Sequence, residues 1–411
     1  QQYIDAGGYS MSKVYIVSAR RTAIGSFLGS LSGVSPADMG VPVVQAVLQD
    51  AGIEPEQVDE LICGNVLSAG LSQGVGRQIA VKSGIPVETC AYSLNMICGS
   101  GLKSVLTAVT QIRAGEADII VAGGVESMSG APYLLPKGTR QGIKMGNYQV
   151  QDHMVLDSLT DAFENIHMGI TAENIAEKYG ITREEQDAFA FDSQQKAIAS
   201  VDAGLFDEEI VPLQVRVGRE EVTFGRDEYP NRKSTPEKLA KLRPAFKKDG
   251  TITAGNASGI NDGASFVVVV SEKALKEHNL TPMAEIIGIG QGGVEPSIMG
   301  MGPVPAIRKA LTKAGLKLSD MELIELNEAF AAQSLGVLHE LSQEHGMAKE
   351  EIMKRTNTAG GAIALGHPVG ASGNRILVTL LHGLKREGKD IGLASLCIGG
   401  GMGCAIVVKR V

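Results

Sequence analysis

The chain has 411 residues, a length at which two or more packed units are expected rather than one simple core. Aromatic residues make up only 4% of the sequence, Trp is absent and 51 residues are Gly, which suits helices and strands that pack closely through small residues. The net charge of -8 argues against nucleic acid or a membrane surface as the main partner, and no apolar run approaches the roughly 18 residues that span a bilayer.

Residues 1–10 precede Met11 and contain no apolar stretch of the kind found in signal peptides, so we interpret them as a remnant of protein expression. Because no targeting segment is recognised, we expect a cytoplasmic protein. The five cysteines are scattered without CxxC spacing, which favours free thiols in a reducing compartment over disulfides or a zinc site. The first predicted strand, residues 14–17, begins directly after Met11, Ser12 and Lys13.

A loop around Cys98 is the next informative element, because it reads Asn-Met-Ile-Cys-Gly-Ser-Gly over residues 95–101 and opens a predicted helix. At a helix N-terminus the unpaired N–H groups and the dipole favour a thiolate, so Cys98 is a candidate nucleophile. The glycines would let another molecule approach closely. For a single Cys the alternative is a buried, inert residue, and the rest of the chain has to decide between them.

An internal repeat organises the two ends of the chain. A helix predicted from Gly101 ends near Asp118, and a strand over residues 119–122 and a Gly-Gly loop follow. A second helix, predicted from Gly373, ends near Asp390, and a strand over residues 391–396 and a Gly-rich loop follow it. Each helix start is 17 positions from its Asp. Two copies of this unit predict two α/β halves whose loops meet at the active site.

Residues 129–256, between the halves, carry several prolines and only short strand-like runs, and a helix with a capping box is predicted at Thr182. Within this region, residues 226–248 hold eight basic side chains against three acidic ones in a chain that is negative overall. This basic segment is either an ordinary solvent-exposed face or a surface that binds phosphate groups.

Residues 288–293 match the pattern G-x-G-x-x-G after a strand-like run over 284–287. A dinucleotide site needs a helix directly afterwards and an acidic residue about 20 positions further on. Prolines follow instead, and position 313 is Lys. We therefore do not expect a nicotinamide or flavin cofactor.

Three further residues stand in places that suit chemistry. Asn327 follows a predicted strand over residues 323–326, His367 lies in the Gly-rich run 360–373, and Cys397 opens another Gly-rich loop. Free backbone amides in such loops can bind an oxyanion. Individually, His367 could be an ordinary loop His and Cys397 a core residue, but four such elements together are hard to explain by packing alone.

These motifs, in this order, resemble the thiolase family, and the resemblance runs from about Lys13 to Arg410. It implies the thiolase fold, an α/β fold with two homologous halves layered α/β/α/β/α and an inserted loop domain. We place the N-terminal half at residues 11–280, including the loop domain at about 129–256, and the C-terminal half at 281–411.

The resemblance to the biosynthetic, acetoacetyl-CoA branch of the family also implies a reaction. Acetyl-CoA would acylate Cys98 while His367 takes the thiol proton, and Cys397 would remove an α-proton from a second acetyl-CoA. The enolate would attack the acetyl-enzyme by a Claisen mechanism to give acetoacetyl-CoA and CoA. Asn327 would hold a water that forms one oxyanion hole with His367, and the N–H groups of Cys98 and Gly399 would form a second.

The same resemblance assigns the substrate contacts. Ser258 would contact the pantetheine arm, and Asn231 beside Arg232 replaces an Arg that relatives carry near the adenine. The acyl pocket and the remaining CoA contacts would be formed by Leu159, His167, Met168, Ala245, Phe246, Met299, Ala329, Phe330 and Arg232. For Met168 and Met299, ordinary core packing is the alternative.

We expect no metal or organic cofactor, since CoA thioesters are the substrates, and a homotetramer, as is usual in the family. Three alternatives remain open. A degradative 3-ketoacyl-CoA thiolase would accept longer chains, a ketoacyl synthase would need a second catalytic His where this chain has Asn327, and a CoA-binding scaffold would not release CoA from acetyl-CoA.

Overall fold

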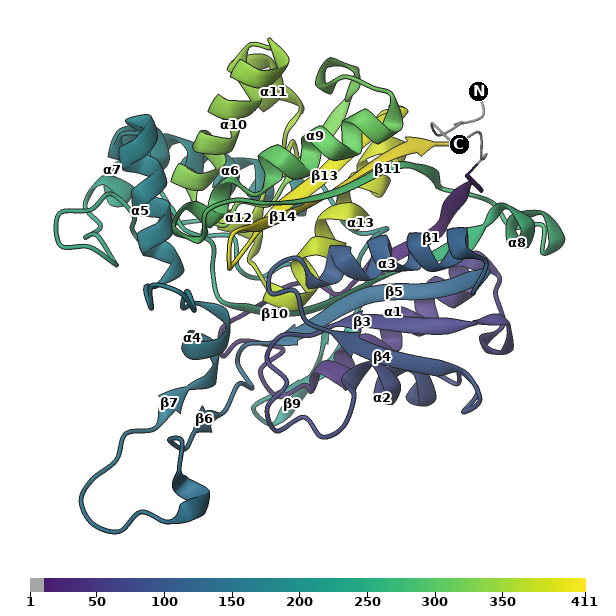
Figure 1. The fold of residues 1–411 in the computed structure, drawn as a ribbon, viewed down its shortest axis with the longest axis horizontal. Coiled ribbons are helices and arrows are strands. Elements are labelled where there is room, and N and C mark those ends of the chain that lie inside the picture. Colours follow the sequence, from purple (N-terminus) through teal and green to yellow (C-terminus); the bar gives the residue numbers. More distant parts are fainter. Residues whose placement is uncertain (1–10) are drawn as a thin grey trace.

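The computed structural model describes residues 11–411, and the expectation that residues 1–10 are an expression remnant lies outside them. Nine strands form one path through a mixed sheet, in the order β12-β13-β14-β11-β1-β10-β5-β3-β4 (Figure 1). Their bounds are β12 (Leu323–Leu326), β13 (Ile391–Ile398), β14 (Met402–Arg410), β11 (Ala284–Gly293), β1 (Val14–Arg21), β10 (Asn261–Ser271), β5 (Ile119–Ser127), β3 (Glu60–Gly64) and β4 (Cys90–Leu94), with β2 (Gly25–Ser26) paired to β10.

The sheet consists of two halves that meet at a short junction, where β1 pairs with β11 only at Tyr15–Glu285 and Ile16–Ala284. Two helices, α3 (Ser100–Ala114) and α13 (Val369–Glu387), pack in one hydrophobic cluster with strands of both halves. Helices α1 (Pro36–Ala51) and α2 (Val75–Lys82) cover the outer face of the N-terminal half. Helices α9 (Pro303–Ala314) and α10 (Ala331–His345) cover that of the C-terminal half.

Alternate residues of a strand pack in different layers, because successive strand residues point to opposite faces of a sheet. In β10, Phe266 and Val268 belong to the outer cluster and Val267 to the central one. The layers therefore run α/β/α/β/α, with α3 and α13 in the middle, as the sequence predicts. The two repeated units appear as α3 followed by β5 and α13 followed by β13.

The central helices touch through glycines. A Cβ atom on Gly124 would lie 1.9 Å from the Gly370 carbonyl oxygen, and one on Gly373 would lie 2.6 Å from the Leu102 nitrogen. Only a residue without a side chain permits such an approach. The beginning of α13 therefore rests directly on β5 and on the first turn of α3.

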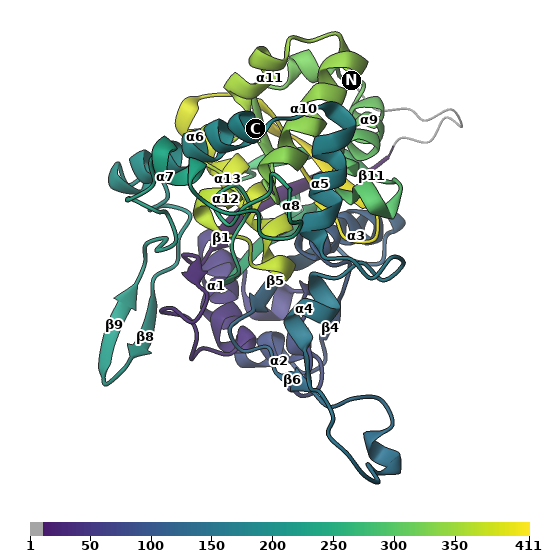
Figure 2. The ribbon, with the colours of Figure 1, turned by 90° about the vertical axis from the view of Figure 1, so that its left-hand side faces the viewer.

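Between β5 and β10 the chain forms short strands and several helices, and the bounds 129–256 of an inserted loop domain stay a prediction. Thr182 caps α6 (Arg183–Asp202), and its capping box with Glu185 is formed as expected. An arm around β6 and β7 and a hairpin of β8 and β9 project from the body (Figure 2). The elements of this region are β6 (Tyr133–Leu134), β7 (Gln151–Asp152), α4 (His153–Ser158), α5 (Met168–Tyr179), α6, β8 (Leu213–Val217), β9 (Glu220–Phe224) and α7 (Pro236–Ala240).

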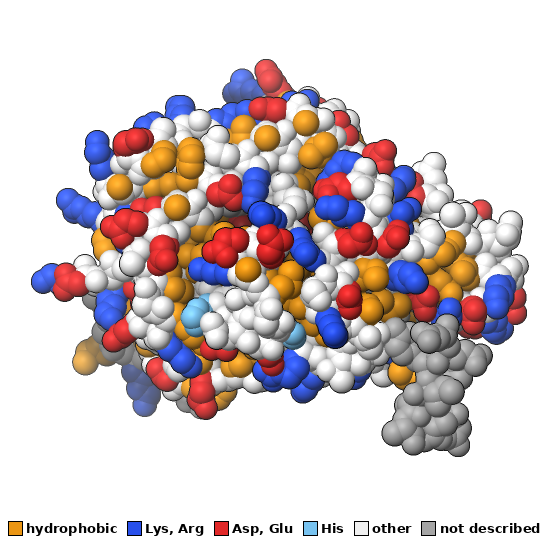
Figure 3. Space-filling model, turned by 90° about the horizontal axis from the view of Figure 1, so that it is seen from above, with side chains coloured by type: hydrophobic (Ala, Val, Ile, Leu, Met, Phe, Trp, Pro, Cys, Tyr) orange, Lys and Arg blue, Asp and Glu red, His pale blue; other side chains and the backbone are white. Residues whose placement is uncertain are grey.

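Three shorter α-helices lie in the rest of the described chain, in addition to the 3-10 helices Pro55–Gln57, Thr139–Gln141, Pro296–Met301 and Leu318–Asp320. These α-helices are α8 (Glu272–Glu277), α11 (Lys349–Arg355) and α12 (Ala362–Leu365). No helix within residues 11–411 combines the length and apolar character needed to cross a bilayer. The face seen from above carries acidic and basic side chains in alternation, with apolar ones between them (Figure 3).

The G-x-G-x-x-G run lies inside a strand and not in a loop, because β11 extends to Gly293, beyond the predicted 284–287. Its glycines bring α9 close to the sheet. A Cβ atom on Gly288 would lie 2.3 Å from the Ala310 oxygen, and one on Gly290 would lie 2.3 Å from the Ala306 oxygen. Helix–sheet packing thus accounts for these glycines.

The glycine contact gives a stability prediction. Gly124→Ala should lower the free energy of unfolding by about 3 kcal/mol, because its methyl group overlaps the backbone of Gly370 and the helix has to move. Gly33→Ala is the matched control, since nothing lies within 4 Å of its added Cβ. Urea unfolding of both variants checks the expectation, and equal midpoints would contradict it.

Candidate active site

A cavity of about 390 Å³ lies beside the N-terminal ends of α3 and α13. It brings together residues that lie far apart in the sequence. The predicted residues that line it are Cys98, Leu159, His167, Met168, Ala245, Phe246, Ser258, Met299, Ala329, Phe330 and His367. Cys397, Asn327 and Gly399 lie outside this lining, and Arg232 does as well.

Cys98 sits on a tight turn directly before α3. Ile97 has φ 48°, a left-handed conformation that is unusual for a β-branched residue. Local bonds hold the turn: the Met96 N–H donates to Ser100 Oγ at 2.8 Å, and Ser100 Oγ donates to the Ile97 carbonyl at 2.7 Å. This turn fixes the direction of the Cys98 side chain.

Burial decides the ionisation of Cys98. It raises the pKa of the thiol to about 11, although hydrogen bonds from the backbone N–H groups of Gly399 and Cys98 act in the opposite direction. The backbone N–H groups favour the thiolate, as the sequence predicts, but burial has the larger effect on the pKa. Desolvation outweighs the N-terminal N–H groups, so the thiol is protonated at neutral pH.

His367 is also neutral. Burial, with a smaller contribution from the positive charge of Arg375, lowers its pKa to about 4. Its backbone N–H donates to Asn261 Oδ1 at 2.9 Å, and its Nδ1 lies 2.5 Å from Ser372 Oγ in the first turn of α13. An uncharged imidazole that shares a cavity with a protonated thiol can accept the thiol's proton.

Cys397 is the last residue but one of β13 and is fully buried, in one hydrophobic cluster with Met168, Met299 and Phe330. Burial raises the pKa of its thiol, and ionisation of the neighbouring Cys98 would raise it further. After the strand the chain turns at Gly400 and Gly401, with φ values of 91° and 88° that favour glycine. This turn brings Gly399 to the sulfur of Cys98.

Asn327 is buried, and neither its Oδ1 nor its Nδ2 has a hydrogen-bond partner among the described residues. Its neighbour Glu328 is held firmly: it accepts from Ser193 Oγ at 2.6 Å and from Asn357 Nδ2 at 3.3 Å. Buried polar atoms without a partner are costly. The amide of Asn327 is therefore suited to hold a small polar molecule such as water.

Aromatic rings form one wall of the cavity. His167 stacks on Phe246 with ring centroids 4.4 Å apart, and Phe330 meets Phe246 edge-on at 6.3 Å. His167 lines the cavity, and its Nδ1 accepts a hydrogen bond from the Gly169 N–H at 3.0 Å. The other ring nitrogen, Nε2, takes no part in this bond. Burial lowers the pKa of His167, so this wall is uncharged.

The basic segment 226–248 reaches the cavity through Tyr229, Ala245 and Phe246. Arg232 is exposed and forms an ion pair with Asp202, with a shortest separation of 2.6 Å. Its predicted contact with CoA stays a prediction. The exposed charges of this segment are placed beside the cavity and not inside it.

Sequence reasoning missed several lining residues. They are Phe27, Met128, Ser158, Tyr229, Ala254, Ala257, Gly259, Ile260 and Val369. Ala257, Gly259 and Ile260 adjoin Ser258, and Val369 adjoins the His367 turn, so sequence neighbourhood could have indicated them. Phe27 follows the short strand β2, which pairs with β10 next to the cavity, and only the fold reveals this position.

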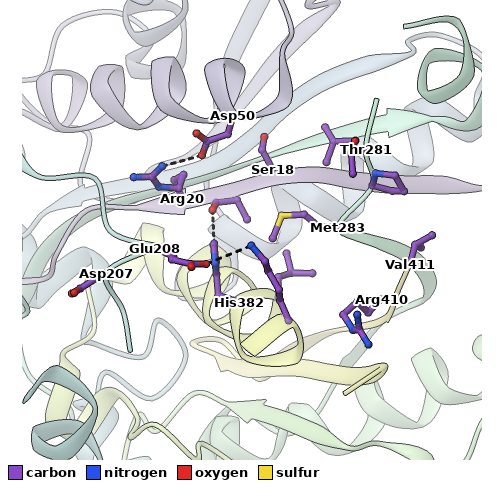
Figure 4. A pocket seen from close by; sticks show the side chains of 15 residues that line it. Ser18, Arg20, Asp50, Asp207, Glu208, Thr281, Met283, His382, Arg410 and Val411 are labelled. Carbon is purple, nitrogen blue, oxygen red and sulfur yellow. Dashed lines mark hydrogen bonds and ion pairs between the residues drawn. The ribbon is translucent and has the colours of Figure 1, made fainter. Parts of the chain in front are cut away.

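A second cavity, of about 730 Å³, lies toward the C-terminal end of α13 (Figure 4). Two ion pairs lie among its lining residues. Arg20 contacts Asp50 at 2.9 Å, Lys385 contacts Glu208 at 3.5 Å, and His382 Nε2 lies 2.8 Å from the Ala19 carbonyl. None of the predicted site residues lines it.

Within residues 11–411, no group of three or more His, Cys, Asp and Glu side chains is arranged to hold a metal ion. All five cysteines are free.

Comparisons with known proteins converge on one family. The thiolase N-terminal domain matches residues 14–273 and the thiolase C-terminal domain residues 280–410. The acetyl-CoA acetyltransferase of Chromobacterium violaceum is 54% identical over 400 residues, covering 97% of this chain and 100% of the relative. That of Escherichia coli is 53% identical over 400 residues with the same coverage.

Comparison with solved structures points to the same family. The acetyl-CoA acetyltransferase of Syntrophomonas wolfei matches with a TM-score of 0.94 and 43% identity, covering 98% of this chain and 100% of that one. The human mitochondrial 3-ketoacyl-CoA thiolase matches with a TM-score of 0.92, also at 43% identity and with the same coverage.

The state of Cys98 gives a second prediction. Because its pKa is raised to about 11, the thiolate fraction grows as pH rises, and alkylation of Cys98 by iodoacetamide should accelerate steadily from pH 7 to pH 9.5. Peptide mass spectrometry measures the rate, with the buried Cys63 as an internal control that stays unlabelled. A rate that levels off below pH 8 would show that the thiol is already ionised.

Proposed function

We propose that this chain, which belongs to the thiolase family, is an acetyl-CoA acetyltransferase that condenses two acetyl-CoA molecules to acetoacetyl-CoA and CoA, and catalyses the reverse thiolysis. The observation that carries the proposal is the meeting of Cys98 and His367 in one cavity, with Cys397 buried directly behind it. Relatives that are 54% and 53% identical over their whole length are named acetyl-CoA acetyltransferases.

In the first half-reaction, Cys98 Sγ attacks the carbonyl carbon of acetyl-CoA. His367 accepts the thiol proton as the C–S bond forms, and returns it to the sulfur of CoA as the original thioester bond breaks. The neutral, buried state of both groups supports this route. The proton moves between partners that start uncharged, so the largely apolar cavity does not have to stabilise a resting ion pair.

In the second half-reaction, Cys397 removes an α-proton from a second acetyl-CoA, and the enolate attacks the acetyl group on Cys98. The acetyl–Sγ bond breaks as the new C–C bond forms, and acetoacetyl-CoA leaves. The proton that Cys397 took passes to the departing Cys98 Sγ, so both residues return to their starting state. The raised pKa of Cys397 supports a role as base once it is ionised, because a more basic thiolate takes a carbon proton more readily.

Two sets of donors would hold the developing negative charge on oxygen. One consists of a water on Asn327 together with His367 while its Nε2 carries the transferred proton, and the unpartnered amide of Asn327 supports this placement. The other consists of the N–H groups of Cys98 and Gly399, which the turn after β13 directs toward the nucleophile. Fixed donors aimed at a developing oxyanion stabilise a transition state strongly.

The cavity wall supports a short acyl chain. Met168 and Met299 are buried at 6% and 2% exposure, and Phe330 and the His167–Phe246 stack close the same space. We assign the pantetheine arm to Ser258, Ala245 and Phe246 at the cavity. The basic segment with Arg232 would meet the phosphates of CoA in solvent, where the attraction is screened by salt.

We further propose a homotetramer in the cytoplasm that needs no metal or organic cofactor, with halves that divide at residues 280 and 281. The arm that projects from the body in Figure 2 supports assembly. It carries the exposed apolar side chains of Tyr133, Leu135, Ile143, Met145, Tyr148 and Val150. A second copy of the chain would cover them. The bacterial origin of the relatives supports the location.

The covalent step gives the central test. Incubation with acetyl-CoA alone should release CoA and add one acetyl group to Cys98, which peptide mass spectrometry after an acid quench detects. Cys397→Ala should keep this label but lose condensation by about 10²–10⁴-fold, the usual contribution of a general base. Label on Cys397, or no CoA release at all, would overturn the assignment.

Chain length tests the substrate. Thiolysis should be efficient for acetoacetyl-CoA and fall steeply for straight chains of six carbons or more, because the methionines fill the space that each further methylene needs. Met299→Ala should partly restore the longer substrates. Comparable kcat/KM for four- and eight-carbon 3-ketoacyl-CoA in the unmutated enzyme would instead identify a degradative 3-ketoacyl-CoA thiolase.

A further inference from the structure

The neutral imidazole of His367 carries one proton, on either Nδ1 or Nε2, and only one of these forms can serve as base at a given nitrogen. The ring shares the cavity with Cys98, so the nitrogen that faces the cavity must be free to accept the thiol proton. Whatever contacts the other nitrogen sets which form is present.

Ser372 makes that contact. Its Oγ lies 2.5 Å from His367 Nδ1 and donates its own proton to the Pro368 carbonyl at 3.0 Å. Ser372 is 1% exposed, in the first turn of α13, so water does not compete for either bond. A hydroxyl that donates to this carbonyl accepts from the ring, and this arrangement favours the proton on Nδ1.

We propose that Ser372 is a positioning residue that holds His367 in the Nδ1–H form and thereby leaves Nε2 as the base for Cys98. The inference rests on the proposed acyl transfer and assigns a role to a residue outside the cavity lining. The Ser372–His367–Cys98 arrangement places a neutral hydroxyl where many hydrolytic sites have a carboxylate.

The bonds need not rearrange during the reaction. When Nε2 takes the proton of Cys98 Sγ, the imidazolium keeps its Nδ1–H on Ser372 Oγ, and the proton on Nε2 passes to the departing CoA sulfur. A hydroxyl accepts this bond without adding a negative charge, so the imidazolium is stabilised less than beside a carboxylate and gives up its proton readily.

The test removes the acceptor. Ser372→Ala should slow CoA release in the first turnover with acetyl-CoA by about 10- to 100-fold, the loss expected when one hydrogen bond to a reacting group is removed. Alkylation of Cys98 by iodoacetamide at neutral pH should slow as well, while the Kd for CoA stays within about twofold. Ser372→Thr keeps a hydroxyl and should restore both rates.

Thr379→Val is the matched control. It also deletes a buried hydroxyl from α13, one that donates to Glu209 at 2.8 Å, far from His367. It should lower the melting temperature and leave both rates unchanged per folded enzyme. If Ser372→Ala does not fold, Ser372→Cys takes its place, because a thiol is a much weaker acceptor and should lower both rates in the same direction.

The outcomes separate the two proposals. Normal CoA release and alkylation in Ser372→Ala would overturn the role of Ser372 while the acyltransferase stands. Equal losses in Ser372→Ala and Thr379→Val would reduce Ser372 to a structural residue. An unmutated enzyme that releases no CoA would overturn the proposed function, and the alkylation rates would still decide whether Ser372 controls Cys98 through His367.

Discussion

The glycine contact between α3 and α13 is the constraint on which the site depends. Each helix has one reactive residue shortly before its first turn, Cys98 ahead of Ser100 and His367 ahead of Val369. A side chain at Gly101, Gly124 or Gly373 would overlap backbone atoms of the neighbouring segment and push the two helix starts apart. Cys98 and His367 are therefore close because the backbones of the neighbouring segments pack directly on one another. The two halves of the molecule hold these segments in contact.

Burial then sets the chemistry that this proximity allows. The same desolvation that raises the pKa of Cys98 to about 11 lowers that of His367 to about 4. Both shifts favour the uncharged form, so the resting site holds a thiol and an imidazole. A charged resting pair would bind counter-ions and water, whereas the neutral pair leaves an apolar cavity for a thioester and creates charge only when the proton moves.

Much of this arrangement was predictable because the motifs are local. The nucleophile turn, the helix–strand repeat, the strand before Asn327 and the capping box at Thr182 all depend on residues close in sequence. The sign of the Cys98 shift was not predictable, since it depends on burial by segments hundreds of residues away. Phe27 and Tyr229 were not predicted for the same reason. Neither belongs to a chemical motif, and only the pairing of distant strands and loops brings them to the cavity. The glycines of β11 match a nucleotide-loop pattern that the following prolines already argue against, and the structure explains them by close packing of α9 on the strand.

Close packing by itself does not fix how far one helix slides along the other, and buried polar bonds supply that register. Glu126 on β5 accepts from the N–H groups of Val66, Leu67 and Gly370 at 2.9–3.0 Å, which ties the first turn of α13 to the N-terminal half. Asn374, one turn further on, donates to the carbonyls of Gly101 and Ala122 at 3.3 and 3.2 Å. A shift of α13 by one residue would leave these buried groups unpaired, which costs far more than the van der Waals contact that a slide would lose. The glycines permit the approach and the polar bonds select one position within it, so His367 reaches Cys98 in a single register.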